Sequence, residues 1–285
     1  MAVEEFRKSG HVIYMGDGIE VLTHHIDDNS VDLIFVDPPY NIGKTFNGNK
    51  EKWDTDNLYL EWCYKWLSLC IDKLNEHGAM YVMTSTQFMP YFDMYLRDKI
   101  DIISRIVWFY DSSGVQAKKS FGSLYEPMLF CVKDKNKYTF NTNDILVEAK
   151  TGAKRNLIDY RKNPPQVYNS KKVPGNVWEF ARVRYRMDEY ENHPTQKPIT
   201  FLERIIKASS NEGDVILDPF SGTFTTSYVA KELKRKSIGI EIEEEYVKIG
   251  LRRVGLREKY NGNILSRTPR SFERKNDPDQ QSLEM

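Results

Sequence analysis

Two short apolar runs in this chain each end in an aspartate followed by a proline. The run Val31 to Val36 stops at Asp37-Pro38-Pro39-Tyr40, and the run Val215 to Leu217 stops at Asp218-Pro219-Phe220. An apolar run bounded by turn residues is typical of a parallel strand that is covered on both faces. We therefore expect two buried strands, each with a carboxylate at its end, although their aspartates are 181 residues apart in the sequence.

The rest of the chain alternates predicted strands with predicted helices, which indicates an α/β fold with a mostly parallel sheet. A long helix begins at Thr55 and Asp56, which can cap it, and is predicted to end at Gly78. The strand 124–132 follows a polar loop, which indicates that it runs antiparallel to its neighbour. The other expected strands are 11–15, 79–84, 102–110 and 237–240, and the other expected helices are 19–25, 87–98, 198–209, 225–233 and 243–254.

Length and composition bound the domain organisation. A chain of 285 residues has room for one large α/β domain, or for one domain that carries a sizeable insertion. The periodicity fades between residues 133 and 192, so we expect residues 1–132 and 193–258 to form one domain around an insertion, with residues 259–285 as a flexible tail. No apolar run has the length of a membrane span or of a signal-peptide core, which favours a cytoplasmic protein. The three cysteines are too scattered to predict a disulfide framework or a zinc site.

The predicted insertion is basic, although the net charge of the whole chain is zero. Residues 150–186 contain ten Lys or Arg residues and only two acidic ones. A basic stripe of this kind can neutralise phosphates. A solvated loop explains the same charges equally well, so charge alone does not decide between the two interpretations.

The second aspartate run predicts a nucleoside site. Gly222 lies just before a predicted helix, where backbone can approach a ligand closely, and Glu241 ends the next predicted strand nineteen residues later. An acid about twenty residues beyond a glycine turn binds ribose hydroxyls in dinucleotide sites. The chain contains neither G-x-G-x-x-G nor the P-loop pattern. We therefore expect a nucleoside without a pyrophosphate, and S-adenosylmethionine is the obvious candidate.

Three motifs in a fixed order resemble those of the amino-methylating DNA methyltransferases. They are Asp-Pro-Pro-Tyr at 37–40, His-Pro-Thr-Gln-Lys-Pro at 193–198 and Asp-Pro-Phe-Ser-Gly at 218–222. The order, with the catalytic motif first and the cofactor motif last, is similar to that of the permuted β class. Three further stretches resemble an adenine-specific orphan member of that class, namely 110–119, 159–166 and 186–198.

The resemblance implies a Rossmann-like S-adenosylmethionine-dependent methyltransferase fold with an irregular DNA-recognition insertion, and it implies how the first motif works. The exocyclic amine of adenine is a poor nucleophile because its lone pair is delocalised into the ring. The Asp37 carboxylate and the Pro38 carbonyl, held rigid by the turn at Pro39, are expected to accept hydrogen bonds from both amine hydrogens. Tyr40 is expected to stack on the base. No metal is required.

The resemblance also implies a set of cofactor contacts. Asp17 is similar to the family's acid that contacts the cofactor adenine, and Glu241 would hold the ribose hydroxyls. The remaining expected cofactor contacts are Asp37, Thr195, Gln196, Lys197, Asp218, Pro219, Phe220, Gly222 and Thr223. The class usually has a second glycine where this chain has Phe224. Trp108 and Glu126 are expected to serve the fold.

Double-stranded DNA is the expected partner, because a methyltransferase must hold the duplex from which its target base is flipped. A loop over the target base is expected at residues 112–119, and a DNA-facing surface is expected in the basic insertion. The candidates are Ser112, Ser113, Lys118 and Lys119 in the loop, and Arg155, Arg161, Lys162, Arg182 and Arg184 in the insertion.

N6-methylation of adenine at a specific site in double-stranded DNA is the interpretation that these patterns favour. N4-methylation of cytosine is the nearest alternative, because both bases present an exocyclic amine. Asp rather than Ser at position 37 favours adenine, whereas relatives that methylate RNA or protein glutamine tend towards Asn there. A catalytically silent DNA-binding protein on the same fold is the alternative from another class. A homodimer is plausible, and no segment of the chain resembles an endonuclease.

Overall fold

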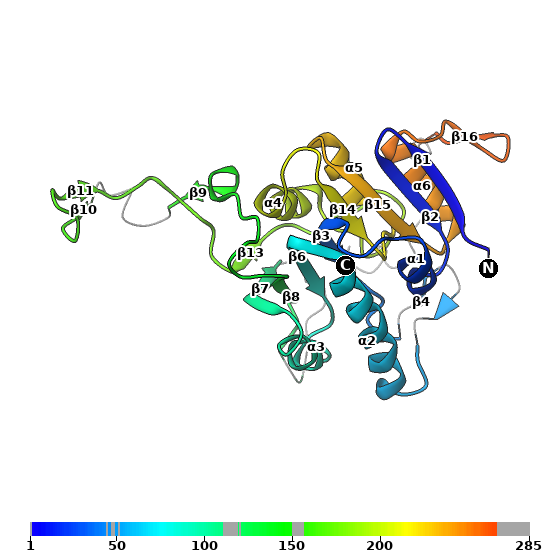
Figure 1. The fold of residues 1–285 in the computed structure, drawn as a ribbon, viewed down its shortest axis with the longest axis horizontal. Helices are drawn as coiled ribbons and strands as arrows, with labels where there is room; N and C mark the ends of the chain where they lie inside the picture. The colour runs from blue at the N-terminus through cyan, green and yellow to red at the C-terminus, as the bar shows by residue number, and fades with distance from the viewer. Residues whose placement is uncertain are drawn as a thin grey trace, which may run out of the picture.

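The computed structural model describes residues 2–43, 45–46, 49–50, 52–110, 119, 121–149 and 157–266. Its centre is a sheet of nine strands in the order β1–β2–β15–β14–β3–β6–β8–β7–β13 (Figure 1). In chain order these strands are β1 (Glu4–Lys8), β2 (His11–Met15), β3 (Val31–Val36), β6 (Leu74–Met83), β7 (Asp101–Phe109), β8 (Tyr125–Val132), β13 (Val177–Glu179), β14 (Val215–Asp218) and β15 (Lys236–Glu241).

The sheet is mostly parallel, as the sequence predicts. Strands β2, β15, β14, β3 and β6 run parallel to one another. Strand β8 is antiparallel to both of its neighbours, β6 and β7, which confirms the antiparallel strand expected at 124–132. The short strand β1, which pairs antiparallel with β2, was not expected from the sequence. It has one buried side chain among five residues, so its apolar pattern is weak.

Helices cover both faces of the sheet. Helices α1 (Gly18–His24), α2 (Asp56–Lys73) and α3 (Met89–Leu96) pack on one face, and α4 (Ile199–Ser209), α5 (Thr225–Glu232) and α6 (Glu244–Val254) pack on the other. The alternation of side chains along β3 shows why a continuous apolar run is needed. Ile34 and Val36 lie in the core beneath α2, whereas Leu33 and Phe35 lie in the core beneath α4.

Helix α2 begins as predicted and ends earlier than predicted. The Thr55 side chain accepts a hydrogen bond from the Leu58 backbone N–H and caps the helix. The helix stops at Lys73, and Leu74 is already in strand β6, so the prediction that Gly78 ends the helix is wrong. Gly78 serves the strand instead, because a Cβ there would lie 2.9 Å from Leu74 Cδ2 and 3.2 Å from the Val31 carbonyl oxygen.

The chain between β8 and α4 leaves the sheet, extends outwards and returns. Residues 157–172, which we call the arm, belong to this excursion, and β10 (Ile158–Asp159) and β11 (Gln166–Val167) lie at its far end (Figure 1). These two strands pair with each other, and β12 (Lys171–Lys172) pairs with β9 (Val147–Glu148). The returning chain forms β13 on the edge of the main sheet, where Trp178 is buried.

The remaining short elements lie outside the main sheet. They are the 3-10 turn η1 (Thr142–Ile145) and two small hairpins, β4 (Thr45–Phe46) with β5 (Asn49–Lys50) and β16 (Lys259–Tyr260) with β17 (Asn263–Ile264). Within the described part of the chain, no helix has the length and apolar character needed to cross a membrane.

Candidate active site

A cavity of about 440 Å³ opens at the carboxyl ends of β3 and β14. These strands are adjacent and parallel, with Leu33 beside Ile216 and Ile34 beside Leu217, so the aspartates that follow them meet at one edge of the sheet. Ligands of open α/β sheets bind at such a crevice. All residues expected from the sequence to be catalytic or cofactor-binding line this cavity: Asp17, Asp37, Pro38, Pro39, Tyr40, Thr195, Gln196, Lys197, Asp218, Pro219, Phe220, Gly222, Thr223 and Glu241.

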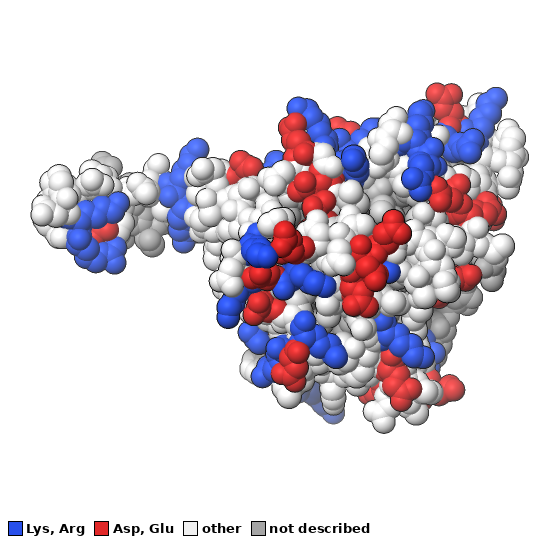
Figure 2. Space-filling model, viewed as in Figure 1, with Lys and Arg blue, Asp and Glu red and all other residues white. Residues whose placement is uncertain are grey.

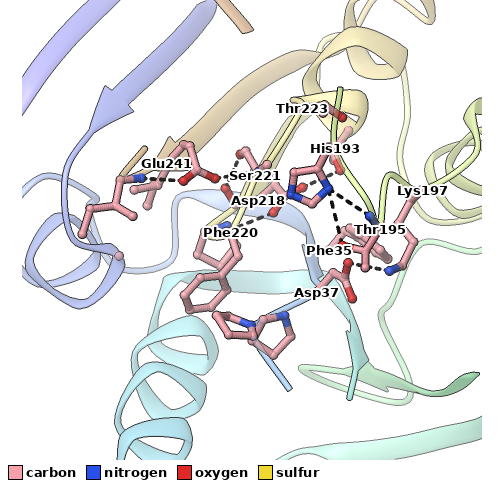
Figure 3. Close-up of a pocket in the computed structure, with 18 of the residues that line it drawn as sticks. Phe35, Asp37, His193, Thr195, Lys197, Asp218, Phe220, Ser221, Thr223 and Glu241 are labelled. Carbon is pink, nitrogen blue, oxygen red and sulfur yellow. Dashed lines mark hydrogen bonds and ion pairs between the residues drawn. The ribbon is translucent and has the colours of Figure 1, made fainter. Parts of the chain in front are cut away.

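The turn after β3 is held by side chains from several elements. Lys197 Nζ lies 2.6 Å from Asp37 Oδ2 (Figure 3). The Tyr40 hydroxyl donates to Asp37 Oδ1 at 2.6 Å. The Tyr59 hydroxyl, from α2, donates to the Pro39 carbonyl at 2.8 Å and fixes the turn from below. A carboxylate offers about four lone-pair positions, so Asp37 can still accept further hydrogen bonds.

Glu126, on β8, completes this cluster and lies outside the set of site residues expected from the sequence. Its Oε2 lies 3.4 Å from Lys197 Nζ and 3.3 Å from the Tyr40 hydroxyl, and its Oε1 accepts from Tyr110 at 3.2 Å. It also lines the cavity. The available signal was an acid near the start of an otherwise apolar strand, 125-YEPMLFCV-132. That signal does not name the partner, because Lys197 is far away in the sequence.

The pKa values in this cluster follow from burial and from the three charges. Burial raises the pKa of Asp37, and the nearby Glu126 adds to this, while Lys197 opposes it. Burial would lower the pKa of Lys197, but Asp37 and Glu126 together raise it. Burial would raise the pKa of Glu126, but Lys197 and then Arg182 lower it. Lys197 is therefore a buried cation shared by two carboxylates.

The turn after β14 is organised around Asp218. Its carboxylate accepts from the Thr226 hydroxyl at 2.5 Å and from the Phe220 backbone N–H at 3.1 Å. Burial raises the pKa of Asp218 to about 7 in spite of these two hydrogen bonds. The Ser221 hydroxyl donates to the Asp218 carbonyl at 2.9 Å. Asp218 thus ties the start of the turn to the first residues of α5.

Glu241, at the end of β15, binds three backbone N–H groups. Its Oε2 accepts from Gly222 at 2.8 Å, and its Oε1 accepts from Ile242 and Glu243 at 2.9 Å each (Figure 3). Burial raises its pKa to about 7, although these donors favour the ionised form. About one lone-pair position, on Oε2, is left by these three donors, and it suits a ribose hydroxyl, which is the role expected for Glu241 from the sequence.

Phe224, where the resemblance leads us to expect glycine, has its ring packed at Gly239 and Gly250 and does not line the cavity. The residue has a left-handed backbone with φ of 57°, and its side chain is fully buried. The ring fills a slot that only glycines leave open: a Cβ at Gly239 would lie 2.7 Å from it, and a Cβ at Gly250 would overlap it. The cavity is therefore lined by Gly222 and Thr223 without interference from Phe224.

Aromatic side chains form the wall of the cavity near Asp17. Asp17 caps α1 by accepting from the Glu20 backbone N–H at 3.0 Å, and it lines the cavity as well. The Phe220 ring packs against Trp62 with centroids 5.5 Å apart. Gly18 lies close to this turn, since a Cβ there would be 3.2 Å from the Pro219 carbonyl oxygen and 3.4 Å from the Phe220 ring. This apolar wall, in the same cavity as Glu241, has the shape and character that suit a planar base. Trp53, Trp62 and Ile42 also line it and were not expected from the sequence.

The segment His193 to Lys197 closes the opposite side of the cavity (Figure 3). His193 packs edge-on against Tyr246, and burial followed by the charge of Lys197 lowers its pKa to about 4, so it is neutral at pH 7. Gln196 is buried, and it accepts from the Glu191 backbone N–H and donates to the Glu189 carbonyl, each at 2.7 Å. Among the described residues, no group of three or more His, Cys, Asp and Glu side chains is placed to hold a metal ion.

The residues expected to bind DNA fall in three places. Arg161 and Lys162 are exposed on the arm, where Arg161 pairs with Asp159 at 2.8 Å. Figure 2 shows Lys and Arg side chains gathered on this arm with little acidic surface. Arg182 lies near the cavity, with its guanidinium carbon 5.1 Å from the centre of the Tyr110 ring. Lys119 and Arg184 are exposed, and Ser112, Ser113, Lys118 and Arg155 lie outside the described residues.

The sequence model of one protein family, described as DNA methylase, matches residues 31–252 of this chain. The chain belongs to the DNA methylase family. Its relatives include the DNA adenine methyltransferase YhdJ of Escherichia coli (strain K12), which is 57% identical over 262 residues, 92% of this chain and 88% of that protein. The type II methyltransferase M.HpaI of Haemophilus parainfluenzae is 35% identical over 84% of this chain and 72% of its own length.

Solved structures agree with this assignment. The complex of M1.HpyAVI with S-adenosylmethionine has a TM-score of 0.58 and 26% sequence identity, and the match covers 85% of this chain and 98% of that one. The PvuII cytosine-N4-specific DNA methyltransferase has a TM-score of 0.66 at 17% identity, covering 90% of this chain and 89% of its own, which shows the shared fold alone. The fold is that of the S-adenosylmethionine-dependent methyltransferases, as the sequence predicts.

Proposed function

We propose that this DNA methylase transfers a methyl group from S-adenosylmethionine to the N6 amine of adenine within a specific site of double-stranded DNA. The observation that carries the proposal is the juxtaposition of Asp37-Pro-Pro-Tyr40 with Gly222 and Glu241 around one cavity. The first turn offers hydrogen-bond acceptors to an amine, and the second offers a ribose-binding acid. The adenine methyltransferase activity named for the 57% identical relative supports adenine as the target base.

Asp37, Pro38 and Tyr40 would prepare the base for reaction. The Asp37 carboxylate and the Pro38 carbonyl would accept the two amine hydrogens, which favours a pyramidal nitrogen whose lone pair points at the incoming methyl group. Tyr40 would exchange its hydrogen bond with Asp37 for a stacked position against the base, a contact worth about 1–3 kcal/mol. This stacking offsets part of the few kcal/mol that flipping the base out of the duplex costs.

The cofactor contacts would divide between the two sides of the cavity. When bound, S-adenosylmethionine supplies an activated methyl group. Glu241 would hold the ribose hydroxyls of the cofactor. Asp17 and the Phe220 ring would contact its adenine. Thr195, Gln196 and Lys197 would lie towards the methionine end. The middle of the cavity would be shaped by four residues of the turn: Asp218, Pro219, Gly222 and Thr223. Because Gly222 has no side chain, the backbone there would approach the ligand closely.

The basic surface would hold the duplex. We propose that Arg161 and Lys162 on the arm, with Arg182, Arg184 and Lys119 nearer the sheet, contact DNA phosphates. We propose that residues 133–192 form the DNA-recognition insertion. The methyltransferase domain would then consist of residues 1–132 and 193–258, followed by a tail at 259–285. A homodimer and a cytoplasmic location remain predictions from the sequence, and their tests are sedimentation of the purified chain and localisation of a tagged one.

The base that is methylated tests the proposed function. The purified chain is incubated with S-adenosylmethionine and DNA from a methylation-deficient strain. The DNA is then digested to nucleosides, which are separated by chromatography and identified by mass spectrometry. We expect N6-methyl-2′-deoxyadenosine above a control without enzyme. N4-methyl-2′-deoxycytidine would instead identify cytosine as the target base. Cofactor and DNA binding without any new methylated nucleoside would identify a silent DNA-binding protein.

A further inference from the structure

The cluster at the turn after β3 contains one more carboxylate than amine recognition requires. Lys197 Nζ contacts Asp37 at 2.6 Å and Glu126 at 3.4 Å, and the three side chains are 17%, 18% and 6% exposed for Asp37, Glu126 and Lys197. A single Lys–Asp pair would be neutral, and the cation would weaken Asp37 as a hydrogen-bond acceptor. The second carboxylate gives the three ionised groups together a net charge of −1.

We propose that Glu126 is a positioning residue for methyl transfer, which shares Lys197 with Asp37 and so keeps the amine pocket negatively charged. The inference rests on the proposed function. In that reaction a bond forms between the amine nitrogen and the methyl carbon while the bond from that carbon to sulfur breaks. The positive charge thereby moves from sulfur to the base, and the amine then releases one proton to solvent. A preorganised negative charge beside the amine stabilises this change.

The surroundings of Glu126 support an electrostatic role over a purely structural one. Tyr110 donates a hydrogen bond to it at 3.2 Å, and the Tyr40 hydroxyl, whose single proton is shared with the closer Asp37, lies 3.3 Å from it. The charged groups that act on it are Lys197 and Arg182, both cationic, and the carboxylate of Asp37. Asp218 is the further acid that interacts with Asp37. Lys197 also lies 5.9 Å from the centre of the Tyr40 ring, so moving Lys197 would affect the face offered to the base.

Replacing Glu126 by glutamine removes the charge and keeps the shape. We expect Glu126→Gln to lower the single-turnover methylation rate by roughly tenfold to a hundredfold, because a preorganised electrostatic group is lost. The Kd for S-adenosylmethionine and the KM for DNA should change little. Glu126→Asp, which keeps the charge, should recover a large part of the rate. The matched control is Glu203→Gln, which removes a carboxylate paired with Lys207 on α4 and should leave the rate unchanged.

The ionisation of Asp37 supplies a readout that a structural role would not move. Glu126 raises the pKa of Asp37, so Glu126→Gln should move the acid limb of the rate profile to lower pH. Carbon-13 NMR of the cofactor-free protein, labelled at its aspartate carboxyl carbons, should show the same displacement for the Asp37 resonance. An Asp37→Asn spectrum assigns that resonance. If Glu126→Gln does not fold, Glu126→Leu, which also removes the charge, replaces it in both measurements.

Two results would overturn the proposal. One is a folded Glu126→Gln protein with a rate within twofold of wild type and an unmoved Asp37 titration. The other is a Glu126→Asp protein as slow as Glu126→Gln, because shape and not charge would then matter. A wild-type chain that methylates no adenine would contradict the proposed function, whereas the NMR titration of the cofactor-free protein would still test how Glu126 and Asp37 share Lys197.

Discussion

The turns after β3 and β14 start alike, with aspartate and proline on adjacent strands, but they are held in different ways. The first turn depends on charged and hydroxyl side chains: Asp37, Tyr40, Lys197 and Glu126 come from three separate segments. The second is held within itself by Asp218, which binds the Thr226 hydroxyl and the Phe220 backbone N–H. It is also held by the backbone N–H groups that Glu241 binds and by the packing of Phe224.

This difference indicates how each turn responds to substitution. In the first turn, one replaced side chain changes the charge at the place proposed for the amine, so the methylation rate should be sensitive to substitution and the fold less so. In the second turn, Gly222 and Thr223 line the cavity proposed for the cofactor, so the backbone geometry should matter most there. A side chain can therefore replace a glycine there, as Phe224 does, provided that its ring is accommodated by the slot at Gly239 and Gly250.

The largest expected effect concerns Phe224 and separates stability from binding. Phe224→Ala should lower the free energy of unfolding by about 3–5 kcal/mol, because a fully buried ring is replaced by a cavity. Phe224→Gly should be about 1–2 kcal/mol more stable to unfolding than Phe224→Ala, because glycine adopts the left-handed backbone without strain. Urea denaturation measures both. At temperatures where the variants are folded, the Kd for S-adenosylmethionine should stay within a few-fold of wild type. A selective loss of binding would show that the ring shapes the ligand site.

The next effect concerns Glu241 and should appear in binding. Glu241→Ala removes the acceptor proposed for the ribose hydroxyls, and hydrogen bonds to a charged group are each worth about 1.5–3 kcal/mol. We expect the Kd for S-adenosylmethionine, measured by calorimetry, to rise roughly tenfold to a hundredfold. Glu245→Ala is the control, since Glu245 is exposed and pairs with Lys248. An unchanged Kd in folded Glu241→Ala protein would remove Glu241 from the cofactor site.

Asp218 should make stability depend on pH. Its pKa is raised by burial from 3.8 to about 7, so between about pH 4 and pH 7 the folded protein retains a proton that the unfolded chain releases. The free energy of unfolding should therefore fall as pH rises through this window, by at most about 1.4 kcal/mol per pH unit for this one group. Asp218→Asn should reduce the dependence of the free energy of unfolding on pH in this window, as measured by urea denaturation at several pH values. The remaining dependence would come from Glu241, whose pKa burial also raises to about 7. A slope equal to that of wild type would show that Asp218 is ionised throughout.

The smallest effect concerns the arm. If Lys162 contacts one phosphate, Lys162→Ala should weaken binding to all duplexes alike and reduce the slope of log K against log salt by about 1. Lys234→Ala is the control, because Lys234 pairs with Glu212 at 3.2 Å at the junction before β15. Fluorescence anisotropy at several salt concentrations measures both. Equal slopes in Lys162→Ala and wild type would show that Lys162 does not contact a DNA phosphate.

Much of the fold and of the cavity could be predicted because their signals are local. Buried parallel strands read as continuous apolar runs, and the residues at their ends, such as Asp37, Gly222 and Glu241, are marked by turns at fixed spacing. Glu126 could not be assigned, since its role depends on pairing of β8 and on a contact with Lys197, both of which are long-range. The end of α2 was misplaced because Gly78 suits a helix end and a close strand contact equally well. The slot for Phe224 likewise exists only once β15 and α6 are packed.

We assign methyl transfer to the turn after β3 and cofactor binding to the turn after β14. Asp37→Ala tests this separation most directly. Single-turnover methyl transfer to DNA and calorimetric binding of S-adenosylmethionine are measured on one preparation. We expect the rate to fall by roughly a hundredfold or more, because an amine acceptor and its charge are lost, while the Kd stays within about tenfold. Methylation that persists at the wild-type rate would contradict the assignment of the chemistry to the turn after β3. Loss of cofactor binding in a folded variant would contradict the separation of the two turns.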